Sequence, residues 1–534
     1  MKNFKKNLSI FLLLIILFST NTFAQSNNTA KNVIVMIPDG MSVEALSFAR
    51  WMTEDNKFTI DDLATGLVRT NNSNTPIADS APAGTAMATG IKTISPYIGS
   101  YPLTSTMPGS DNFNKNKINF PVANVLEGAN RLNKSTGIIS TSNIQHATPA
   151  DFSAHHLDRN AYEEIAEQQV YQNIDIVLGA GSKYLEKSIR KDKEDLIKEI
   201  KSRGYDYITN TQELKNSKSD KIWGSFNEES MSYDLDRDEK VEPSLAEMTE
   251  KALDVLSKNN NGLFLMVEGS EIDWAAHAND PIALKSDILA FDKAVKVAKD
   301  FADKNPNTIL LIASDHGTGG ITFGNNNISK GYDKVPLDEF TKIIKDAKIT
   351  STKLTKQINK DKSNISNLLE EHYNIKDLST LEIEEIKNSK SMENTINKII
   401  SNRSNIAWTT EGHVGGDVAL YCYSTNENIK PLSGTVHNSD IGKYLAQIQN
   451  IDLDKLSKEL YIPARKSFED KGAKVEFISS PNQILKVTKD NTYIEFFVNK
   501  NYCIINGKKK TLSGLIVFNG EKVFIPKDAL SLIN

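Results

Sequence analysis

Runs of apolar residues recur along the chain, and each ends in turn residues, an acid or a histidine. The first spans 32–40 and reads Asn-Val-Ile-Val-Met-Ile-Pro-Asp-Gly, a pattern typical of a strand that is buried on both faces. Comparable runs occupy 136–140, 174–178, 262–267 and 308–313. Amphipathic segments with helical spacing separate them, as in 158–171 and 281–303. This alternation predicts an α/β fold in which a mostly parallel central sheet is sandwiched by helices.

Two later segments depart from the alternation. The segment 321–405 is rich in Lys, Asn, Ser and Ile with helical spacing, which predicts a helical insertion. The segment 470–534 has short alternating strands with Asn-Gly turns, which predicts a small β-rich accessory domain. Within it, 504–526 resembles the amine-oxidase-N-terminal-like domains appended to secreted bacterial proteins. The residues 25–469 would form one main domain around the insertion.

Polar side chains follow the predicted parallel strands, and ligands bind at the carboxyl ends of strands in sheets of this class. Asp39, Glu268 and Asp315 each come at the end of an apolar run. His413 instead precedes the apolar run 418–423. This strand must therefore run antiparallel to the others if His413 is to reach the same edge, as mixed sheets allow.

The N-terminus predicts export. Three lysines among the first six residues precede an apolar run over 10–18, and Thr-Phe-Ala at 22–24 resembles a signal-peptidase site. We interpret 1–24 as a cleaved signal peptide and expect a periplasmic or secreted protein. A nine-residue run is too short to span a bilayer and no later run is long enough, so we expect no membrane span after cleavage.

Charge and cysteine content narrow the function further. The formal charge is -5 at pH 7, and loss of 1–24, which carries three lysines and no acid, makes it -8. Acidic and basic residues are interspersed, so we expect no nucleic-acid partner. Cys422 and Cys503 lie in strand-like apolar segments, which favours buried free thiols, although export would permit a disulfide.

The segment 77–92 places one serine ahead of a run of very small residues. Ser80 is predicted to cap the N-terminus of a helix, with Pro82 in the first turn and Gly90 as the left-handed residue that ends it. Free N–H groups and the positive end of the helix dipole suit a hydroxyl that ionises or carries a phosphoryl group. Ser80 is therefore the candidate nucleophile.

The acids and histidines near the strand ends form a set large enough for several metal ions. The set comprises Asp39, Glu268, Asp273, His277, Asp315, His316 and His413, with Thr148 as a neutral oxygen donor. Asp273 and His277 are four residues apart, which puts both on one face of a helix. Imidazole with carboxylate suits zinc, whereas Asp39, Thr148 and Glu268 supply only oxygens, as magnesium prefers.

Together these motifs resemble those of the metal-dependent alkaline phosphatase family, secreted bacterial branch, in the right order over roughly 30–460. The matching positions are Asp39-Gly40, Asp79-Ser80-Ala81, Ala147-Thr148-Pro149, Arg159, Val267-Glu268-Gly269, Asp273, His277, Asp315-His316-Gly317 and Gly412-His413. The resemblance implies that 25–469 is a catalytic domain that hydrolyses phosphate monoesters.

The resemblance also implies the role of each residue. Asp273, His277 and His413 would hold one zinc ion; Asp39, Asp315 and His316 a second; and Asp39, Thr148 and Glu268 a magnesium ion. Ser80 would form a phosphoserine intermediate, and Arg159 would clamp the non-bridging phosphate oxygens. Members of the family often form homodimers, an assembly that the insertion and the C-terminal unit could alter.

The resemblance does not extend to two positions: the best-known enterobacterial members have an acid and a lysine where this chain has His146 and Trp274. Marine and cold-active members are similar to this chain. Both side chains would then lie behind the ligands and affect magnesium retention and phosphate release. Trp274 could equally be a packing aromatic. The other histidines, His155, His156, His372 and His437, are expected not to bind metal.

Three alternatives remain at this point: a sulfatase, a phosphodiesterase of the same superfamily, and an exported metal- or phosphate-binding protein. Ser80-Ala81-Pro82 is similar to the start of the sulfatase motif, but Gly84 stands where that motif has an arginine. A binding protein would need the ligands but not Ser80.

Overall fold

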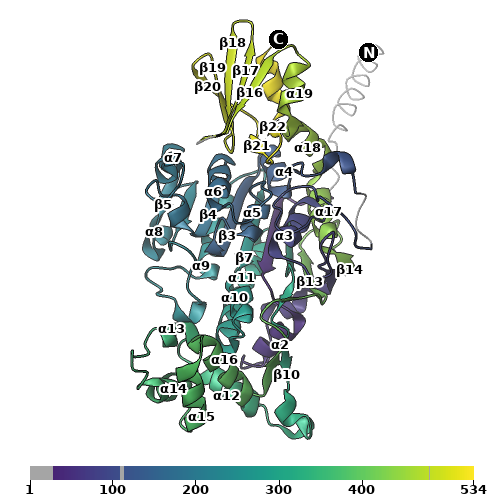
Figure 1. Ribbon diagram of the computed structural model, residues 1–534. Helices are drawn as coiled ribbons and strands as arrows, with labels where there is room; N and C mark the ends of the chain where they lie inside the picture. Colours follow the sequence, from purple (N-terminus) through teal and green to yellow (C-terminus); the bar gives the residue numbers. More distant parts are fainter. Residues whose placement is uncertain (1–27, 109–112, 480–481, 534) are drawn as a thin grey trace, which may run out of the picture.

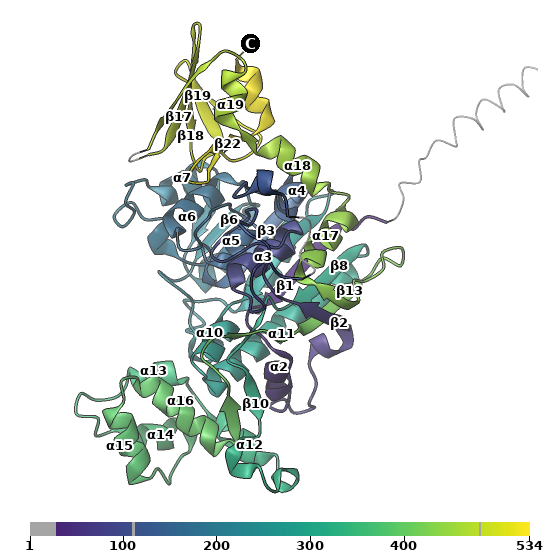
Figure 2. The same cartoon turned by 45° about the vertical axis from the view of Figure 1, so that its right-hand side comes forward.

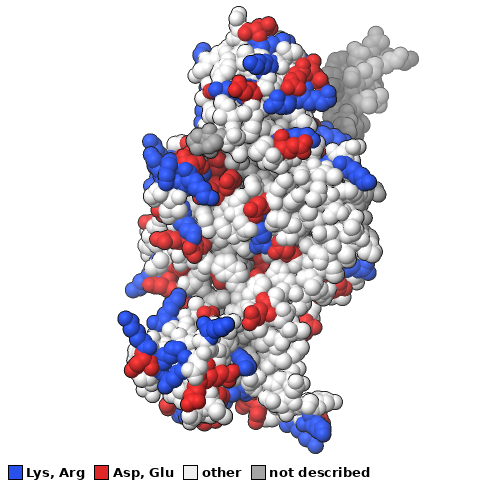
Figure 3. All heavy atoms as spheres, viewed as in Figure 1, with Lys and Arg blue, Asp and Glu red and all other residues white. Residues whose placement is uncertain are grey.

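The computed structural model describes residues 28–108, 113–479 and 482–533. The predicted signal peptide, 1–24, lies outside the described residues. Within the described part of the chain, no helix has the length and apolar character that a membrane span requires. Lysine and arginine side chains intermix with acidic ones over the face of the molecule seen in Figure 3.

A central sheet, ten-stranded over the described residues, forms the middle of the molecule (Figures 1 and 2). In spatial order its strands are β14 (Gly434–His437), β2 (Ala64–Arg69), β13 (Val418–Ser424), β8 (Thr308–Ala313), β1 (Asn32–Pro38), β7 (Leu263–Gly269), β3 (Ser135–Asn143), β4 (Ile176–Ala180), β6 (Ile222–Ser225) and β5 (Asp206–Ile208). Strand β13 pairs antiparallel with both neighbours, and the other described pairs of this sheet are parallel. The predicted mostly parallel sheet, with an antiparallel strand after His413, is confirmed.

Two hydrophobic cores cover the two faces of the sheet, because successive strand residues point to opposite faces. In β1, Val33 and Val35 belong to one core and Ile34 and Met36 to the other. One core is closed by α2 (Val43–Arg50), α9 (Leu245–Leu256), α10 (Glu271–His277) and α11 (Pro281–Lys304). The other is closed by α3 (Ser80–Thr89), α4 (Val125–Arg131), α6 (Tyr162–Tyr171), α7 (Leu196–Ser202) and α17 (Asn438–Gln449).

One predicted helix begins later than its periodicity indicates. The segment 158–171 is helical only from Tyr162, the start of α6. The Asp158 carboxylate accepts a hydrogen bond from the N–H of Asn160 at 2.9 Å, and this local turn competes with the helix. Arg159, which lies between these two residues, is therefore in a turn.

The segment 321–405 forms a helical lobe below the sheet, beside α10 (Figures 1 and 2). Its helices are α12 (Asp338–Asp346), α13 (Ser351–Thr355), α14 (Ile365–Tyr373), α15 (Thr380–Asn388) and α16 (Met392–Arg403). The lobe starts with a short strand that the pattern did not predict, β10 (Ile321–Phe323), which pairs antiparallel with β11 (Ile406–Trp408). The two ends of the lobe therefore leave the main domain side by side.

The C-terminal unit has its own sheets and core. Over the described residues, a five-stranded antiparallel sheet contains β16 (Lys474–Ile478), β17 (Ile484–Lys489), β18 (Thr492–Phe497), β19 (Tyr502–Ile505) and β20 (Lys508–Thr511). A smaller sheet contains β15 (Ile462–Pro463), β21 (Val517–Phe518) and β22 (Val523–Ile525), and α18 (Leu453–Leu460) and α19 (Ala464–Glu469) lead into the unit. Ala464 and Phe468 of α19 pack into this C-terminal core.

Buried polar contacts tie the C-terminal unit to the main domain. Lys500 lies 3.2 Å from Glu167 of α6 and also pairs with Glu194.

The two cysteines do not form a disulfide. Cys422 in β13 and Cys503 in β19 are both buried and free, as predicted.

Helix α3 packs backbone to backbone against α17. A Cβ added at Gly442 of α17 would lie 2.3 Å from the amide nitrogen of Gly90 and 2.8 Å from the carbonyl oxygen of Ala86. Backbone atoms cannot rotate aside as a side chain can, so the contact fixes the position of α3. Gly90 itself ends α3 in the predicted left-handed conformation, with φ 74°.

Gly442→Ala should therefore destabilise the protein by about 1–3 kcal/mol, the usual cost of overpacking, although alanine is the better helix former. The measurement is the apparent melting temperature of the purified variant. Gly416→Ala is the matched control, because its added Cβ would meet nothing within 4 Å. Equal melting temperatures for Gly442→Ala and the parent would contradict the close packing.

Candidate active site

The carboxyl ends of β1, β7 and β8 bring three acids to one edge of the sheet. Asp39 directly follows β1, Glu268 lies in β7 opposite Ile37 of β1, and Asp315 lies two residues beyond β8. All three acids are buried. Asp315 accepts a hydrogen bond from the N–H of Gly40 at 3.1 Å, which ties the turn after β1 to the turn after β8.

A first group of metal-ligand candidates joins α10 to β12 (His413–Val414). Asp273 approaches His277 Nε2 at 3.3 Å and His413 Nε2 at 3.8 Å, and the two Nε2 atoms lie 3.1 Å apart. Their Nδ1 atoms face the carbonyl oxygens of Glu411 and Ala78 at 2.5 and 2.7 Å. An imidazole that donates from Nδ1 presents a lone pair at Nε2. Two such lone pairs and a carboxylate turned toward one point fit a divalent cation.

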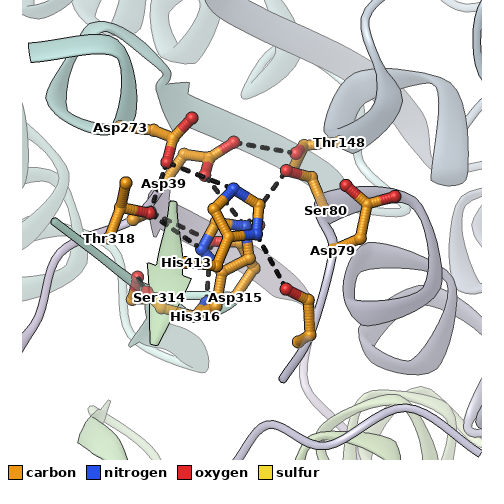
Figure 4. A network of polar contacts seen from close by, with 12 residues as sticks. Asp39, Asp79, Ser80, Thr148, Asp273, Ser314, Asp315, His316, Thr318 and His413 are labelled. Atoms are coloured by element: carbon orange, nitrogen blue, oxygen red, sulfur yellow. Dashed lines mark hydrogen bonds and ion pairs between the residues drawn. The ribbon is translucent and has the colours of Figure 1, made fainter. Parts of the chain in front are cut away.

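A second group surrounds His316 (Figure 4). His316 Nε2 lies 3.1 Å from Asp315 Oδ2 and 3.6 Å from Asp39 Oδ1. Among the described residues, neither of these two buried oxygens has a hydrogen-bond partner. An unsatisfied buried carboxylate oxygen costs several kcal/mol, of the order of its desolvation, so both oxygens fit ligation of a cation.

A third group offers mainly oxygens. Thr148, on α5 (Ala147–Asp151), donates to Asp39 Oδ2 at 3.3 Å. Glu268 accepts a hydrogen bond from Ser140 at 2.6 Å through Oε2, while its Oε1 lacks a partner within the described chain. His146 has a ring nitrogen close enough to the carboxylates of Asp39 and Glu268 for all three to reach one ion. The arrangement suits a hard cation with one imidazole beside it.

The electrostatics of the site favour added positive charge. Burial, together with the charges of Asp315 and Asp273, raises the pKa of Asp39 well above its usual range. Burial raises the pKa of Glu268 to about 7. The hydrogen bond to Asp273 raises the pKa of His277 to about 9. Each shift has the sign expected where acids crowd one another away from water, which bound cations would relieve.

Ser80 lies at the start of α3, but it is not the cap. The N-cap position belongs to Asp79, and Ser80 is the first helical residue, which corrects the predicted position by one residue. The Asp79 side chain makes no capping bond because it is paired with Arg159 instead. The buried Ser80 Oγ lies 3.2 Å from His316 Nε2 (Figure 4). Its hydroxyl therefore faces the second ligand group.

Arg159 reaches the site from the turn between α5 and α6. One Nη nitrogen pairs with Asp79, and the other lies 3.0 Å from His146 Nε2. Burial and the nearby Arg159 charge lower the pKa of His146 to about 3, so this ring is neutral. The ring of Trp274 meets that of His146 edge to face at 5.8 Å. Both departures from the enterobacterial pattern thus lie side by side.

The sulfatase alternative meets a steric obstacle. A Cβ at Gly84, where the sulfatase motif has arginine, would lie 2.2 Å from a carboxylate oxygen of Asp151. Asp151 in turn accepts a hydrogen bond from Thr85 at 2.6 Å, which holds α5 against α3. The helix behind Ser80 therefore has no room for that side chain.

Three residues of the site were not singled out for a role by the sequence analysis. Asp79 holds Arg159, Ser140 binds Glu268, and Thr318 donates to Asp273 at 2.5 Å and lies 3.2 Å from His316 Nδ1. Asp79 directly precedes Ser80 and Thr318 follows His316 by two residues, whereas Ser140 was indicated only by its place at the end of the predicted strand 136–140. The histidines expected not to bind metal, His155, His156, His372 and His437, belong to none of the ligand groups found in the described chain.

Two family models match the chain. The model described as alkaline phosphatase matches residues 30–451, and the model described as copper amine oxidase N-terminal domain matches residues 453–532. The first match covers most of the chain and includes every candidate site residue.

Individual relatives agree with the first match. Alkaline phosphatase 4 of Bacillus subtilis is 37% identical over 448 residues, which are 79% of this chain and 90% of the relative. Repressible alkaline phosphatase of Saccharomyces cerevisiae is 30% identical over 510 residues, 84% of this chain and 87% of the relative.

Solved structures of alkaline phosphatases also match the chain. The cold-active alkaline phosphatase from a psychrophilic Shewanella sp. is 28% identical with a TM-score of 0.67, over 78% of this chain and 99% of that one. The enzyme from the Antarctic bacterium TAB5 is 27% identical with a TM-score of 0.55, over 79% and 99%. The fold, the converging acids and histidines, and these matches lead to one conclusion: the chain belongs to the alkaline phosphatase family, divalent-metal enzymes that hydrolyse phosphate monoesters.

Proposed function

We propose that this enzyme hydrolyses phosphate monoesters in two steps, through a phosphoserine at Ser80. The observation that carries the proposal is the position of Ser80 Oγ, 3.2 Å from His316 Nε2 and at the first residue of α3. Unpaired backbone N–H groups and the positive end of the helix dipole favour an alkoxide and then a phosphoryl group at this position.

In the first step Ser80 loses its hydroxyl proton to solvent, and its oxygen bonds to phosphorus. The bond from phosphorus to the alcohol oxygen breaks, that oxygen keeps the electron pair, and it takes up a proton from water. In the second step a water oxygen bonds to phosphorus and the bond to Ser80 breaks, which releases inorganic phosphate and restores the hydroxyl. Arg159 holds two non-bridging oxygens throughout, through the N–H groups that Asp79 and His146 leave free.

Two zinc ions and one magnesium ion complete the proposal. Their ligands would be Asp273, His277 and His413; Asp39, Asp315 and His316; and Asp39, Thr148 and Glu268. When bound, such ions stabilise the charge that develops on the entering and leaving oxygens. A His 135 Asp variant of the TAB5 enzyme, 26% identical to this chain with a TM-score of 0.56, is described with Mg bound in its M3 site, so magnesium binding occurs in this fold. His146 and Trp274 would orient the residues around that ion.

The proposal extends to the organisation of the whole chain. It includes export by the signal peptide 1–24 to the periplasm or medium, a catalytic domain over 25–469 and an accessory domain over 470–534. A homodimer is the assembly that the family resemblance favours.

Replacing the nucleophile should remove the covalent intermediate. Ser80→Ala is expected to lower kcat by on the order of 10³-fold or more and to abolish acid-stable phosphate on the protein, while metal content stays near that of the parent. The assay is labelling with a radioactive phosphate ester followed by acid quench. Ser95→Ala is the matched control, because Ser95 bonds to Asp79 and leaves Ser80 in place. Labelled phosphate on any other serine of the parent would overturn the assignment.

Ligand substitutions should differ in severity. Asp39→Asn should impair metal retention and turnover more than Thr148→Ala, because Asp39 serves two of the proposed ions with a full charge and Thr148 serves one as a neutral donor. The metal content of both purified variants is measured by elemental analysis. Their activity is then measured after zinc and magnesium are added separately. Full recovery of the metal-stripped parent with zinc alone would argue against a separate magnesium site.

Arg159 should accelerate the hydrolysis of monoesters more than that of diesters. A monoester offers two charged oxygens to Arg159, whereas a diester offers less charge and an added substituent. Arg159→Ala should slow an aryl monoester by about one to three orders of magnitude in kcat/KM and its methyl diester much less. Arg159→Lys keeps the charge but cannot make the bidentate contact, so its loss of kcat/KM on the monoester should lie between those of the parent and Arg159→Ala. Equal losses for the two esters would mean that Arg159 does not hold the phosphate.

A further inference from the structure

The segment that carries Arg159 has little regular structure of its own. Residues 152–161 join α5 to α6, and within the described chain their one strand-like contact is a bridge between His156 and Ile98. The N–H of Arg159 donates to the carbonyl oxygen of Pro96 at 2.9 Å. These bonds hold one edge of the segment, so its position also depends on what its side chains contact.

His155 fastens this segment to the protein interior through all four of its polar atoms, and it is completely buried. Its N–H donates to Gln168 Oε1 at 2.8 Å, and its carbonyl oxygen accepts from Gln168 Nε2 at 3.0 Å. Its Nδ1 donates to the carbonyl oxygen of Gly99 at 2.9 Å. Its Nε2 lies 2.6 Å from the hydroxyl of Tyr461 and 3.2 Å from a carboxylate oxygen of Glu127. Because buried polar atoms without partners are costly, these contacts fix the position of His155.

Two of the partners involve the C-terminal unit. Tyr461 ends α18, the helix that leads into the unit, and its ring meets that of His155 edge to face at 4.8 Å. Asn499 lies in the turn after β18, and its Oδ1 accepts from Gln168 Nε2 at 3.1 Å. Its Nδ2 donates to Glu167 at 3.1 Å. Figure 1 shows the strands β16 to β18 above α6, the helix that carries Gln168 and Glu167.

Both side chains lie outside the part of the chain that matches alkaline phosphatase. That match ends at residue 451, whereas Tyr461 and Asn499 fall within 453–532, the range of the second family model. Residues of the second unit therefore complete a buried network inside the first.

The chain between His155 and Arg159 is short and is itself held by hydrogen bonds. The N–H of Asp158 donates to His156 Nδ1 at 3.0 Å, and the turn at Asp158 follows directly. Beyond it, the guanidinium of Arg159 is held by Asp79. A displacement of His155 would therefore reach Arg159, and a displacement of about 1 Å in a group that orients substrate can cost on the order of 10²-fold in rate.

We propose that Tyr461 and Asn499 are positioning residues for Arg159, and that the C-terminal unit thereby completes the active site. The inference rests on the proposed role of Arg159 in holding the phosphate. It gives the unit a part in the hydrolysis of the ester, although none of the candidate catalytic or metal-binding residues belongs to it.

Two variants remove the contacts one at a time. Tyr461→Phe removes only the hydroxyl and keeps the ring against His155. Asn499→Gly removes the amide and keeps a residue that suits the left-handed backbone at this position, where φ is 67°. Each should lower kcat/KM for p-nitrophenyl phosphate by about two- to tenfold, the effect of one lost hydrogen bond, and lower that for its methyl diester much less.

Asn501→Ala is the matched control. Asn501 is also a buried asparagine of the C-terminal unit, but its side chain accepts from Arg203 at the end of α7, at 3.5 Å. This contact does not lead to His155. The kcat/KM of this variant for p-nitrophenyl phosphate should therefore stay near that of the parent.

Combining each variant with Arg159→Ala distinguishes positioning of Arg159 from a general loss of stability. Without the guanidinium there is nothing left to position, so Tyr461→Phe and Asn499→Gly should then change kcat/KM for the monoester by less than about twofold. A loss of equal size with and without Arg159 would overturn the inference. Melting temperatures report whether each variant folds, and Asn499→Gly decides the question if Tyr461→Phe does not.

The outcomes separate this inference from the proposed function. Parent-like kcat/KM in both single variants, with a strong loss in Arg159→Ala, would overturn the positioning role and leave the proposed function intact. Parent-like hydrolysis of the monoester by Arg159→Ala would instead overturn the proposed role of Arg159, and this inference with it.

Discussion

Four carboxylates buried within one site set the main constraint on this protein. Asp39, Glu268, Asp273 and Asp315 come from adjacent strand ends and from α10, and none is more than slightly exposed. Parallel strands bring their carboxyl ends to one edge, so the sheet itself forces the charges together. Charge repulsion and desolvation at such spacing are large, and bound cations can offset both at once. The sheet that forms the fold therefore also creates the need for metal ions at its edge.

Ser80, the proposed nucleophile, is positioned by close helix packing around α3 and by the charged pair at the start of that helix. Gly442 lets α17 approach the end of α3, and Gly84 lets α5 approach its middle. At the start of the helix, the Asp79–Arg159 pair stands beside Ser80. These contacts fix the positions of Ser80 and Arg159 within the fold, which is the preorganisation that the proposed function requires.

The sequence was most informative where burial is complete. Strands β1, β7 and β8 are apolar throughout, so both the sheet and the acids at its edge could be predicted. Strands β2 and β14 at one end of the sheet are largely exposed, and their residues carry no comparable pattern. Exposed strands of this kind depend on pairing with distant segments, which a local pattern does not encode.

Within the site, sequence patterns identified the ligand candidates but not their supports. Cap preference cannot choose between Asp79 and Ser80, because both residue types cap helices well; the pairing of Asp79 with Arg159, 80 residues away, decides it. Thr318 lies in β9 (Gly317–Thr318), which pairs with β12, and only that tertiary contact gives its hydroxyl a role.

In the proposed site, bound cations hold the converging acids and histidines together. The most direct measurement is anomalous diffraction from crystals of the protein purified without chelator, recorded above and below the zinc absorption edge. Two zinc peaks are expected, one bonded to Asp273, His277 and His413 and one to Asp39, Asp315 and His316, with a non-anomalous ion beside Thr148 and Glu268. Zinc peaks elsewhere in the molecule, or an ordered site with no peak in a fully active preparation, would contradict it.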